Sequence, residues 1–199
     1  MHRIIFASWN RHKYREMYSM LEPAGVSLIF GPDLLDPEKR IDVLEDSCSY
    51  AGNALKKAIE WAGVSGMVTL ADDSGLEVRS LDWGPGVMSA RVAPDDRSRV
   101  GWLLREMDGL TDRKARFVAV LALVDLRKGN YLLAEGTCSG NISLEPSGKS
   151  GFGYDPVFIP DGYSDSLASL GPAVKSEISH RSIAAAALCR MLVSGCVVK

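Results

Sequence analysis

Cysteine is scarce in this sequence and is not arranged as a metal or redox motif. The four cysteines, Cys48, Cys138, Cys189 and Cys196, stand far apart and form no C-x-x-C pair. Structural zinc sites and dithiol redox centres need closely spaced thiols, so the spacing argues against both. We expect free thiols.

Long apolar runs and a dominant charge are also missing. The apolar stretch at the N-terminus is short, and the one around 184–198 is broken by Arg190, so neither predicts a signal peptide or a membrane span. The 23 basic and 25 acidic residues give a formal net charge of -2, which provides no broad positive field for a polyanion. We therefore expect a soluble cytoplasmic protein that binds neither nucleic acid nor membranes.

Three well-known motifs are absent as well. The sequence contains no Walker loop G-x-x-x-x-G-K-[ST], no G-x-G-x-x-G after a strand, and no G-x-S-x-G elbow around Ser8 or Ser74. These absences argue against a P-loop, a dinucleotide-binding turn and a serine hydrolase. Any phosphate recognition must come from a few focused groups.

The hydrophobic pattern alternates between short apolar runs and helical periodicities, which is typical of an α/β domain. Predicted strands cover 4–7, 26–30, 67–71, 76–81, 115–126 and 131–139, with a short strand near Val157, and predicted helices cover 11–21, 46–62 (closed by Gly63), 99–107 and 182–193. A hairpin turn at 128–130 joins the two long strands, which makes the predicted sheet mixed. We see no repeat or linker, and expect one domain over residues 1–199.

Two adjacent carboxylates, Asp72 and Asp73, end the apolar run 67–71. Two negative charges at the end of a buried strand are unfavourable unless a cation lies between them. We interpret the pair as part of a divalent-metal site, with a solvated turn as the alternative. Magnesium usually takes one or two protein carboxylates and completes its shell with water and phosphates, so Glu45 plus Asp73 would suffice. Glu45 has an alternative role as a helix-entry acid.

Ser8, Asn10 and Lys13 lie where the first predicted strand ends and the first helix begins. The free N–H groups and the dipole of a helix N-terminus favour phosphate, and Lys13 adds a full positive charge. The alternative is that Asn10 only caps the helix while its basic neighbours form a solvated face.

The segment 150–156 places two aromatic residues among glycines, next to an acid fixed by Pro156. Glycine lets a backbone approach a flat ligand, Phe152 can stack on a base, and Asp155 can accept from ring N–H groups. Packing of both aromatics in the core is the alternative.

Basic groups and donors also precede the last predicted helix. Lys175 and the triplet Ser179-His180-Arg181 stand there, with Ser179 as a plausible N-cap. A neutral His180 can read a base edge while Arg181 reaches a carbonyl or a phosphate.

These clusters, in this order, resemble the Ham1 family of non-standard purine nucleoside triphosphate pyrophosphatases. The resemblance rests on five colinear segments and on Lys175, and it covers nearly the whole chain. The segments are 4–13 (IIFASWNRHK), 53–58 (NALKKA), 71–78 (ADDSGLEV) with 84–91 (GPGVMSAR), 151–158 (GFGYDPVF) and 178–181 (ISHR).

The resemblance implies an elongated α/β fold of the inosine triphosphatase type, with a mixed sheet, flanking helices, two lobes around a central cleft, and a homodimer. It also implies magnesium-dependent hydrolysis of ITP, dITP and XTP to the monophosphate and pyrophosphate. By position, Asp73 would be the base, and Glu45 and Asp73, with Asp72 as a further ligand or neighbour, would hold the metal. The implied nucleotide-binding residues are Ser8, Trp9, Asn10, Arg11, His12, Lys13, Ser74, Phe152, Gly153, Tyr154, Asp155, Lys175, His180 and Arg181.

Three positions depart from the pattern of that family. Trp9 stands where glycine is usual, Gly52 where an acid commonly precedes the Asn-Ala pair, and Met88 where an aromatic follows Gly-Pro-Gly. Trp9 could crowd the phosphate loop, and Gly52 removes a carboxylate. Two alternatives therefore stay open: a nucleotide-binding module without hydrolysis, and a pyrophosphatase with a shifted substrate.

Overall fold

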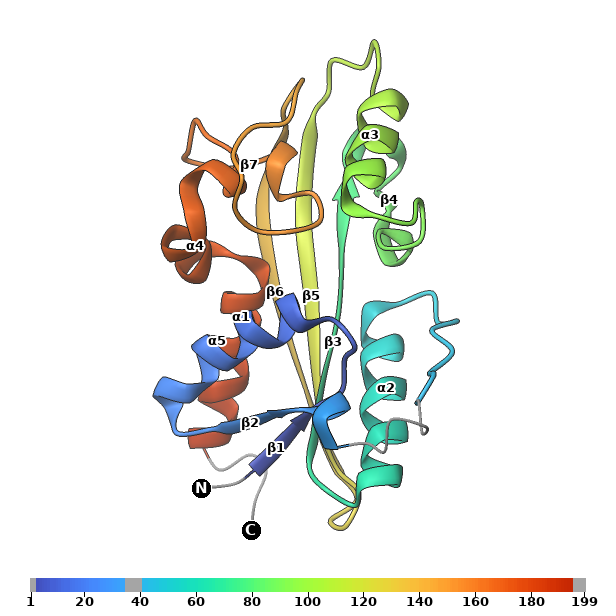
Figure 1. The fold of residues 1–199 in the computed structure, drawn as a ribbon, viewed down its shortest axis with the longest axis vertical. Helices are drawn as coiled ribbons and strands as arrows, with labels where there is room; N and C mark the ends of the chain where they lie inside the picture. Colours follow the sequence, from blue (N-terminus) through green and yellow to red (C-terminus); the bar gives the residue numbers. More distant parts are fainter. Residues whose placement is uncertain (1–2, 35–40, 195–199) are drawn as a thin grey trace. The chain divides into compact units, whose positions relative to one another are not determined.

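The computed structural model describes residues 3–34 and 41–194, which form an α/β fold around a mixed sheet (Figure 1). The strands are β1 (Arg3–Phe6), β2 (Ser27–Phe30), β3 (Thr69–Val78), β4 (Gly84–Pro85), β5 (Lys114–Asp125), β6 (Asn130–Ile142) and β7 (Phe158–Pro160). The α-helices are α1 (Arg11–Leu21), α2 (Tyr50–Ser65), α3 (Asp96–Glu106), α4 (Leu167–Ile178) and α5 (His180–Val193).

The sheet has the strand order β2-β1-β3-β5-β6-β7, and β4 pairs with β3 off this path. β1 pairs in parallel with both β2 and β3, whereas the β3–β4 and β6–β7 pairs are antiparallel. The prediction of an α/β fold with a mixed sheet is therefore confirmed.

The chain divides into two compact units, and each has its own core. Unit 1 comprises Met1–Asp73, Ala119–Gly136 and Arg181–Lys199, and unit 2 comprises Ser74–Val118 and Thr137–His180. The strands β3, β5 and β6 contribute residues to both units. The cleft expected between two lobes stays a prediction.

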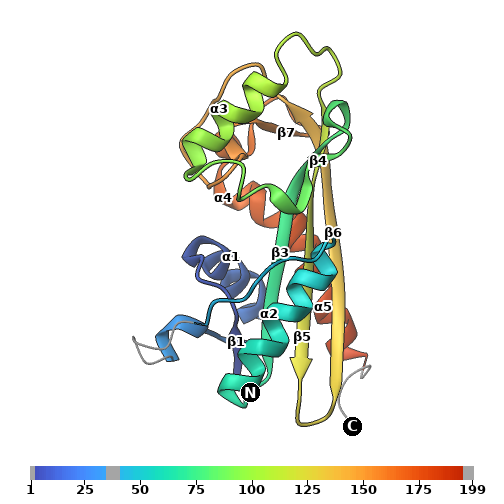
Figure 2. The ribbon, with the colours of Figure 1, turned by 90° about the vertical axis from the view of Figure 1, so that its right-hand side faces the viewer.

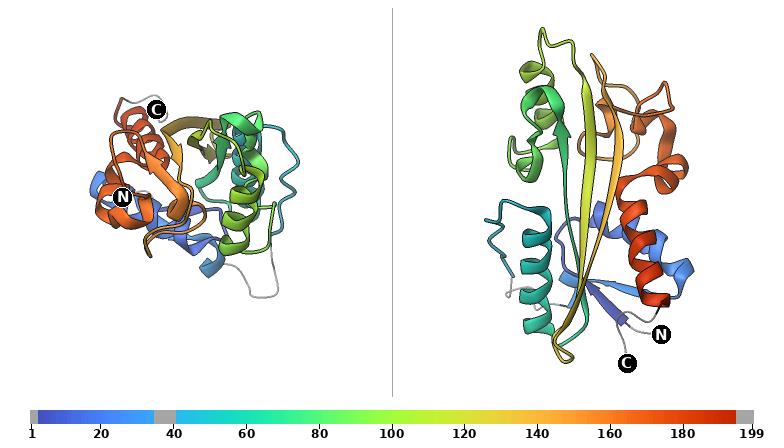
Figure 3. Two further views of the ribbon diagram at one scale, coloured as in Figure 1. Left: turned by 90° about the horizontal axis from the view of Figure 1, so that it is seen from above. Right: turned by 180° about the vertical axis from the view of Figure 1, so that it is seen from behind.

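The core of unit 1 has two layers, because successive residues of a strand point to opposite faces. Ile4 and Phe6 of β1 pack with the apolar sides of α1 and α5, while Ile5 packs with Ala54 and Ala58 of α2. Figure 1 and the view from behind in Figure 3 show α1 and α5 on one side of the strands of this unit and α2 on the other.

The core of unit 2 lies on one side of its strands. Leu103 of α3, Leu167 of α4 and Phe117 of β5 belong to one buried cluster, in which the rings of Phe117 and Phe158 lie 4.6 Å apart. Figure 2 shows α3 and α4 on the same side of β5 and β6.

Several predicted boundaries were wrong. The predicted strand 67–71 was expected to end at the aspartate pair, but β3 continues through it to Val78. The predicted helix 46–62 begins at Tyr50 with Ser49 as its N-cap, passes through Gly63, and is capped by Gly66 at φ 66°. α4 was not predicted, because Gly171, which is non-helical, and Pro172 interrupt its pattern.

In the described ranges, no helix has the length and apolar character needed to cross a membrane. Cys48, Cys138 and Cys189 are free, as predicted, and burial raises the pKa of the Cys138 thiol to about 11. Cys196 and the end of the apolar tail predicted at 184–198 lie outside the described residues.

Candidate active site

The two neighbouring carboxylates of β3 are both buried and face opposite sides of the sheet. The exposed fractions of Asp72 and Asp73 are only 1% and 6%. Leu70 belongs to the core layer of α1 and α5, and Ala71 to that of α2, so the alternation along β3 directs Asp72 to the first layer and Asp73 to the second. The solvated-turn alternative is therefore wrong, and a metal ion shared by the two carboxylates stays a prediction.

Asp72 belongs to a buried network of ion pairs in unit 1. Its Oδ2 lies 3.0 Å from Nζ of Lys13 and accepts from Nε of Arg181 at 3.1 Å. Nη1 of the same arginine donates to Oε2 of Glu16 at 3.2 Å. Burial acts to raise the pKa of Asp72, but Lys13 and Arg181 outweigh it, so the pKa lies far below its usual value and Asp72 stays ionised.

Burial disfavours the charged form of Lys13, the lysine of this network. Burial lowers the pKa of Lys13, and the neighbouring cations Arg181 and Lys57 lower it further, although Asp72 opposes the shift. A further anion close to Lys13 would favour its charged form. The network can therefore accept a phosphate.

Asp73 is held by two side chains of α2. Its Oδ2 accepts from Nδ2 of Asn53 at 3.2 Å, and its Oδ1 lies 3.0 Å from Nζ of Lys57. The same ammonium lies 2.6 Å from Oε1 of Glu45 and donates to the backbone carbonyl of Asp72 at 2.9 Å. Lys57 thus links the two carboxylates that the sequence proposed as metal ligands.

The sequence reasoning assigned no role to Asn53 or Lys57. They lie four residues apart, so both project from one face of α2, and that face also carries the buried Ala54 and Ala58. A polar residue on an otherwise buried helical stripe was the available signal, because such a residue needs a partner inside the protein.

Burial sets the proton affinities on this side of the strand. It raises the pKa of Asp73 even though Lys57 lies beside it, which makes this carboxylate a better proton acceptor than a free aspartate. Burial acts to lower the pKa of Lys57, but Asp73 and Glu45 outweigh it, so the pKa of this lysine is raised.

No three histidine, cysteine or acidic side chains gather as a metal-binding group in the part of the chain that the structure describes. Glu45 and Asp73 nevertheless offer hard carboxylate oxygens, and the Glu45 side chain is 30% exposed. This pair fits a magnesium ion that keeps waters and phosphates in its shell. Asp72 fits less well, because Lys13 and Arg181 already neutralise it.

The segment before α1 is ordered by its own hydrogen bonds. Oδ1 of Asn10 accepts from the backbone N–H groups of His12 and Lys13 at 2.9 and 3.2 Å, so the predicted capping alternative holds for Asn10. Oγ of Ser8 accepts from the backbone N–H of Asn10 at 3.1 Å. The predicted phosphate loop is therefore preorganised at the N-terminus of α1.

Two residues of this segment have partners outside the ion network. Nε1 of Trp9 donates to the carbonyl of Ile41 at 3.0 Å, and its ring lies edge-on to Trp61 at 5.8 Å. Arg11 pairs with Asp33 at 2.8 Å and lies over the ring of Phe30. The predicted roles of Trp9, Arg11 and His12 toward a nucleotide stay predictions.

The glycine-rich segment of unit 2 is a tight loop built on Asp155. Its Oδ2 accepts from the backbone N–H of Phe152 at 2.8 Å and pairs with the buried Lys175 of α4. A Cβ at Gly151, where φ is +79°, would lie 2.1 Å from that same oxygen, so the turn requires glycine here. Asp155 therefore shapes the loop, a role that the sequence did not indicate.

The two aromatic residues of this loop differ in how deeply they are buried. Tyr154 is buried in the unit 2 core and donates its hydroxyl to the carbonyl of Ser89 at 2.9 Å, so the core-packing alternative holds for it. Phe152 is only half-buried, with Nζ of Lys175 4.5 Å from its ring centre. A flat ligand can therefore meet Phe152, but not Tyr154.

The structure places the triplet at the start of α5 inside the protein. His180 is 2% exposed, and its ring stacks on Phe117 in unit 2 at 4.7 Å. Arg181 is 4% exposed and belongs to the Asp72 network of unit 1. Ser74 is half-buried on β3, and its predicted contact with the nucleotide stays a prediction.

The model of the Ham1 family matches residues 4–191 of this chain. The chain belongs to the Ham1 family.

Curated and solved Ham1 relatives agree with the match. The chain is 40% identical to the protein of Mycobacteroides abscessus named dITP/XTP pyrophosphatase, over 96% of this chain and 94% of that protein. It is 42% identical to the protein of the same name from Prochlorococcus marinus, over 92% and 88%. The solved HAM1 protein from Coxiella burnetii superposes with a TM-score of 0.86 at 34% identity, covering 98% of this chain and 100% of that one.

Proposed function

We propose that this Ham1 protein hydrolyses non-standard purine nucleoside triphosphates, such as dITP, XTP and ITP, to the monophosphate and pyrophosphate. The observation that carries the proposal is the buried cluster of Lys13, Asp72, Asp73 and Lys57 beside the N-terminus of α1. The relatives named dITP/XTP pyrophosphatase support the substrate class.

Lys13 and the preorganised segment before α1 bind the triphosphate. Burial and the neighbouring cations disfavour the charged form of Lys13, so a polyanion close to it would restore that form, and the dipole of α1 adds to the attraction. Glu16 pairs with Arg181, Arg181 holds Asp72, and Asp72 holds Lys13, so the ammonium is positioned before the substrate arrives.

Glu45 and Asp73 would hold a magnesium ion. When bound, such an ion neutralises the charge that develops on the phosphate oxygens. Lys57 already balances both carboxylates and keeps them within reach of one cation.

Asp73 serves as the base toward a water molecule. The water oxygen attacks the α-phosphorus, the bond from that phosphorus to the bridging oxygen breaks, and pyrophosphate leaves with the bonding electrons. The proton of the water passes to a carboxylate oxygen of Asp73, whose raised pKa favours this transfer. Asn53 and Lys57 keep that carboxylate oriented throughout.

Recognition of the purine is assigned to Phe152, whose half-buried ring can stack on a base. A 6-keto oxygen would accept a hydrogen bond from His180, as inferred from the sequence, whereas the 6-amino group of ATP would leave the donor unsatisfied. ATP should therefore be a poor substrate.

A homodimer, a cytoplasmic location and magnesium as the metal belong to the same proposal. They follow from the family resemblance of the sequence. The two alternatives of a non-hydrolysing module and a shifted substrate make different predictions in the assay below.

Pyrophosphate release from ITP, dITP, XTP and ATP, with and without magnesium, tests the proposal. We expect release from the first three with magnesium, little from ATP, and a loss of at least about 100-fold in Asp73→Asn. Asp161→Asn, a change in an exposed acid of unit 2, is the control. Tight binding of ITP without turnover would establish the binding module, and preference for ATP would establish a shifted substrate.

A further inference from the structure

A cavity of about 410 Å³ lies in unit 1, and none of its lining residues belongs to the ion network of Asp72 or Asp73. It is bounded by the starts of β1 and β3, the end of β5, the turn after β5 and the end of α5. Cavities of roughly 300 to 1,000 Å³ are the usual size for small-molecule sites. The volume therefore suits a small-molecule ligand other than the proposed nucleotide substrate.

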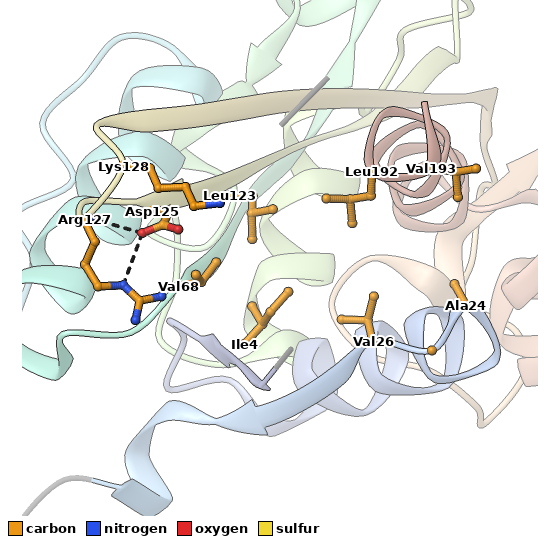
Figure 4. Close-up of a pocket in the computed structure, with 11 residues that line it drawn as sticks. Ile4, Ala24, Val26, Val68, Leu123, Asp125, Arg127, Lys128, Leu192 and Val193 are labelled. Atoms are coloured by element: carbon orange, nitrogen blue, oxygen red, sulfur yellow. Dashed lines mark hydrogen bonds and ion pairs between the residues drawn. The ribbon is translucent and has the colours of Figure 1, made fainter. Parts of the chain in front are cut away.

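The cavity is apolar along most of its length and charged at one end. Figure 4 shows Asp125, Arg127 and Lys128 together at one end. The apolar walls run from there past Ile4, Val68 and Leu123 to Val26, Leu192 and Val193. A matching ligand has a charged head and a linear apolar tail.

The charge of the head follows from the partners at the charged end. Oδ1 of the buried Asp125 already accepts from the backbone N–H of Arg127 at 3.1 Å and lies 3.5 Å from its Nε. Lys128 makes no ion pair with a carboxylate of the described residues, and its ammonium extends toward Leu123 in Figure 4. The charge left unbalanced at this end is therefore positive.

We propose that this cavity binds a monomeric medium-chain carboxylate, with the carboxylate on Lys128 and the tail along the apolar walls toward Ala24. Each buried methylene should tighten binding about fourfold until the tail reaches the far end of the cavity. This site is independent of the proposed nucleotide chemistry, so it stands even if that proposal fails.

Calorimetric titration of the full chain with hexanoate, octanoate and decanoate tests the site. We expect saturable binding that tightens from hexanoate to octanoate, and weaker binding of octanol, which has no charge. Lys128→Met should remove the preference for octanoate over octanol while leaving octanol binding unchanged. Lys149→Met, which removes an exposed lysine of unit 2, should change nothing.

A second variant blocks the apolar end. Ala24 is exposed, so Ala24→Trp can fill the mouth of the cavity without disturbing the core, and it should weaken decanoate more than hexanoate. The proposal would be overturned if neither Lys128→Met nor Ala24→Trp changed the measured affinities.

Other occupants would give other results, and each would overturn the proposal. Binding only to phosphatidylglycerol vesicles, with no binding of the free acids, would assign the cavity to a membrane lipid. Binding that appears only after residues 195–199 are deleted would assign it to the end of this chain. Binding that is lost on dimerisation would assign it to a second copy.

Discussion

Asp72 and Asp73 are adjacent in sequence, yet Lys13 neutralises the first and Lys57 the second on opposite faces of β3. Consecutive residues of one strand would therefore take different roles in the proposed reaction. Asp72 would position Lys13 for the substrate, and Asp73, whose pKa is raised by burial, would be the base.

Replacing Lys57 should lower the free energy of unfolding more than replacing its neighbour Lys56. Lys57→Met leaves Glu45 and Asp73 without their shared cation, and we expect a loss on the order of 3 kcal/mol in urea unfolding. Added magnesium should recover part of this loss, because a dication can replace the ammonium. Lys56→Met is the matched control: its pair with Asp46 is exposed, so its cost should stay below about 1 kcal/mol. Equal losses in the two variants would contradict the assignment.

The lowered pKa of Asp72 predicts that the free energy of unfolding falls in acid. A folded-state pKa below the unfolded value stabilises the fold above the unfolded pKa, and this stabilisation disappears as the pH falls through the folded pKa. Asp72→Asn should therefore be strongly destabilising at pH near 7, and its difference from the parent protein should shrink steadily as the pH falls below the unfolded pKa of about 4. The measurement is urea unfolding across that range. A difference between the two proteins that does not change with pH would show that the ion network is not its cause.

Two glycines of α2 should respond to alanine in opposite ways. A Cβ at Gly52 would lie 2.1 Å from Oγ and 2.8 Å from Cβ of Ser47, so Gly52→Ala should cost about 1 to 3 kcal/mol. Nothing lies within 4 Å of a Cβ at Gly63, so Gly63→Ala should gain about 0.5 to 1 kcal/mol from helix propensity alone. Thermal unfolding compares the two variants. Stabilisation by both would mean that Ser47 moves aside and that an acid at position 52 is also tolerated.

Asp96 of α3 should position the aromatic loop of unit 2. Its Oδ2 accepts from the backbone N–H of Gly153 at 2.7 Å, next to Phe152, while its Oδ1 pairs with Arg99 at 2.8 Å. Asp96→Ala frees the loop, so we expect KM for ITP to rise about tenfold with little change in kcat. Asp108→Ala, an exposed acid just beyond α3, serves as the control. A fall in kcat at constant KM would place Asp96 in the chemical step instead.

The α/β architecture was predictable because short apolar runs and helical stripes alternate along the chain. The full length of β3 was not predictable, because two adjacent aspartates look like the end of a strand when the basic residues that neutralise them are not known. Those cations are Lys13 and Arg181, which are 59 and 109 residues from Asp72 in sequence, and Lys57, which is 16 residues from Asp73. Such long-range pairs leave no local pattern.

Two of the predicted binding residues have structural partners that the sequence did not reveal. Asp155 and Tyr154 looked like nucleotide contacts, but the loop uses one for its own turn and the core uses the other. Asn53 and Lys57 were overlooked because helical periodicity marks a buried face without saying which polar residues on it have partners.

Trp9 gives this protein an intrinsic optical reporter. Its indole is 43% exposed, directly follows Ser8, and lies edge-on to Trp61. The tryptophan fluorescence of the protein should therefore change when an anion binds at the proposed phosphate site at the start of α1, without any attached dye.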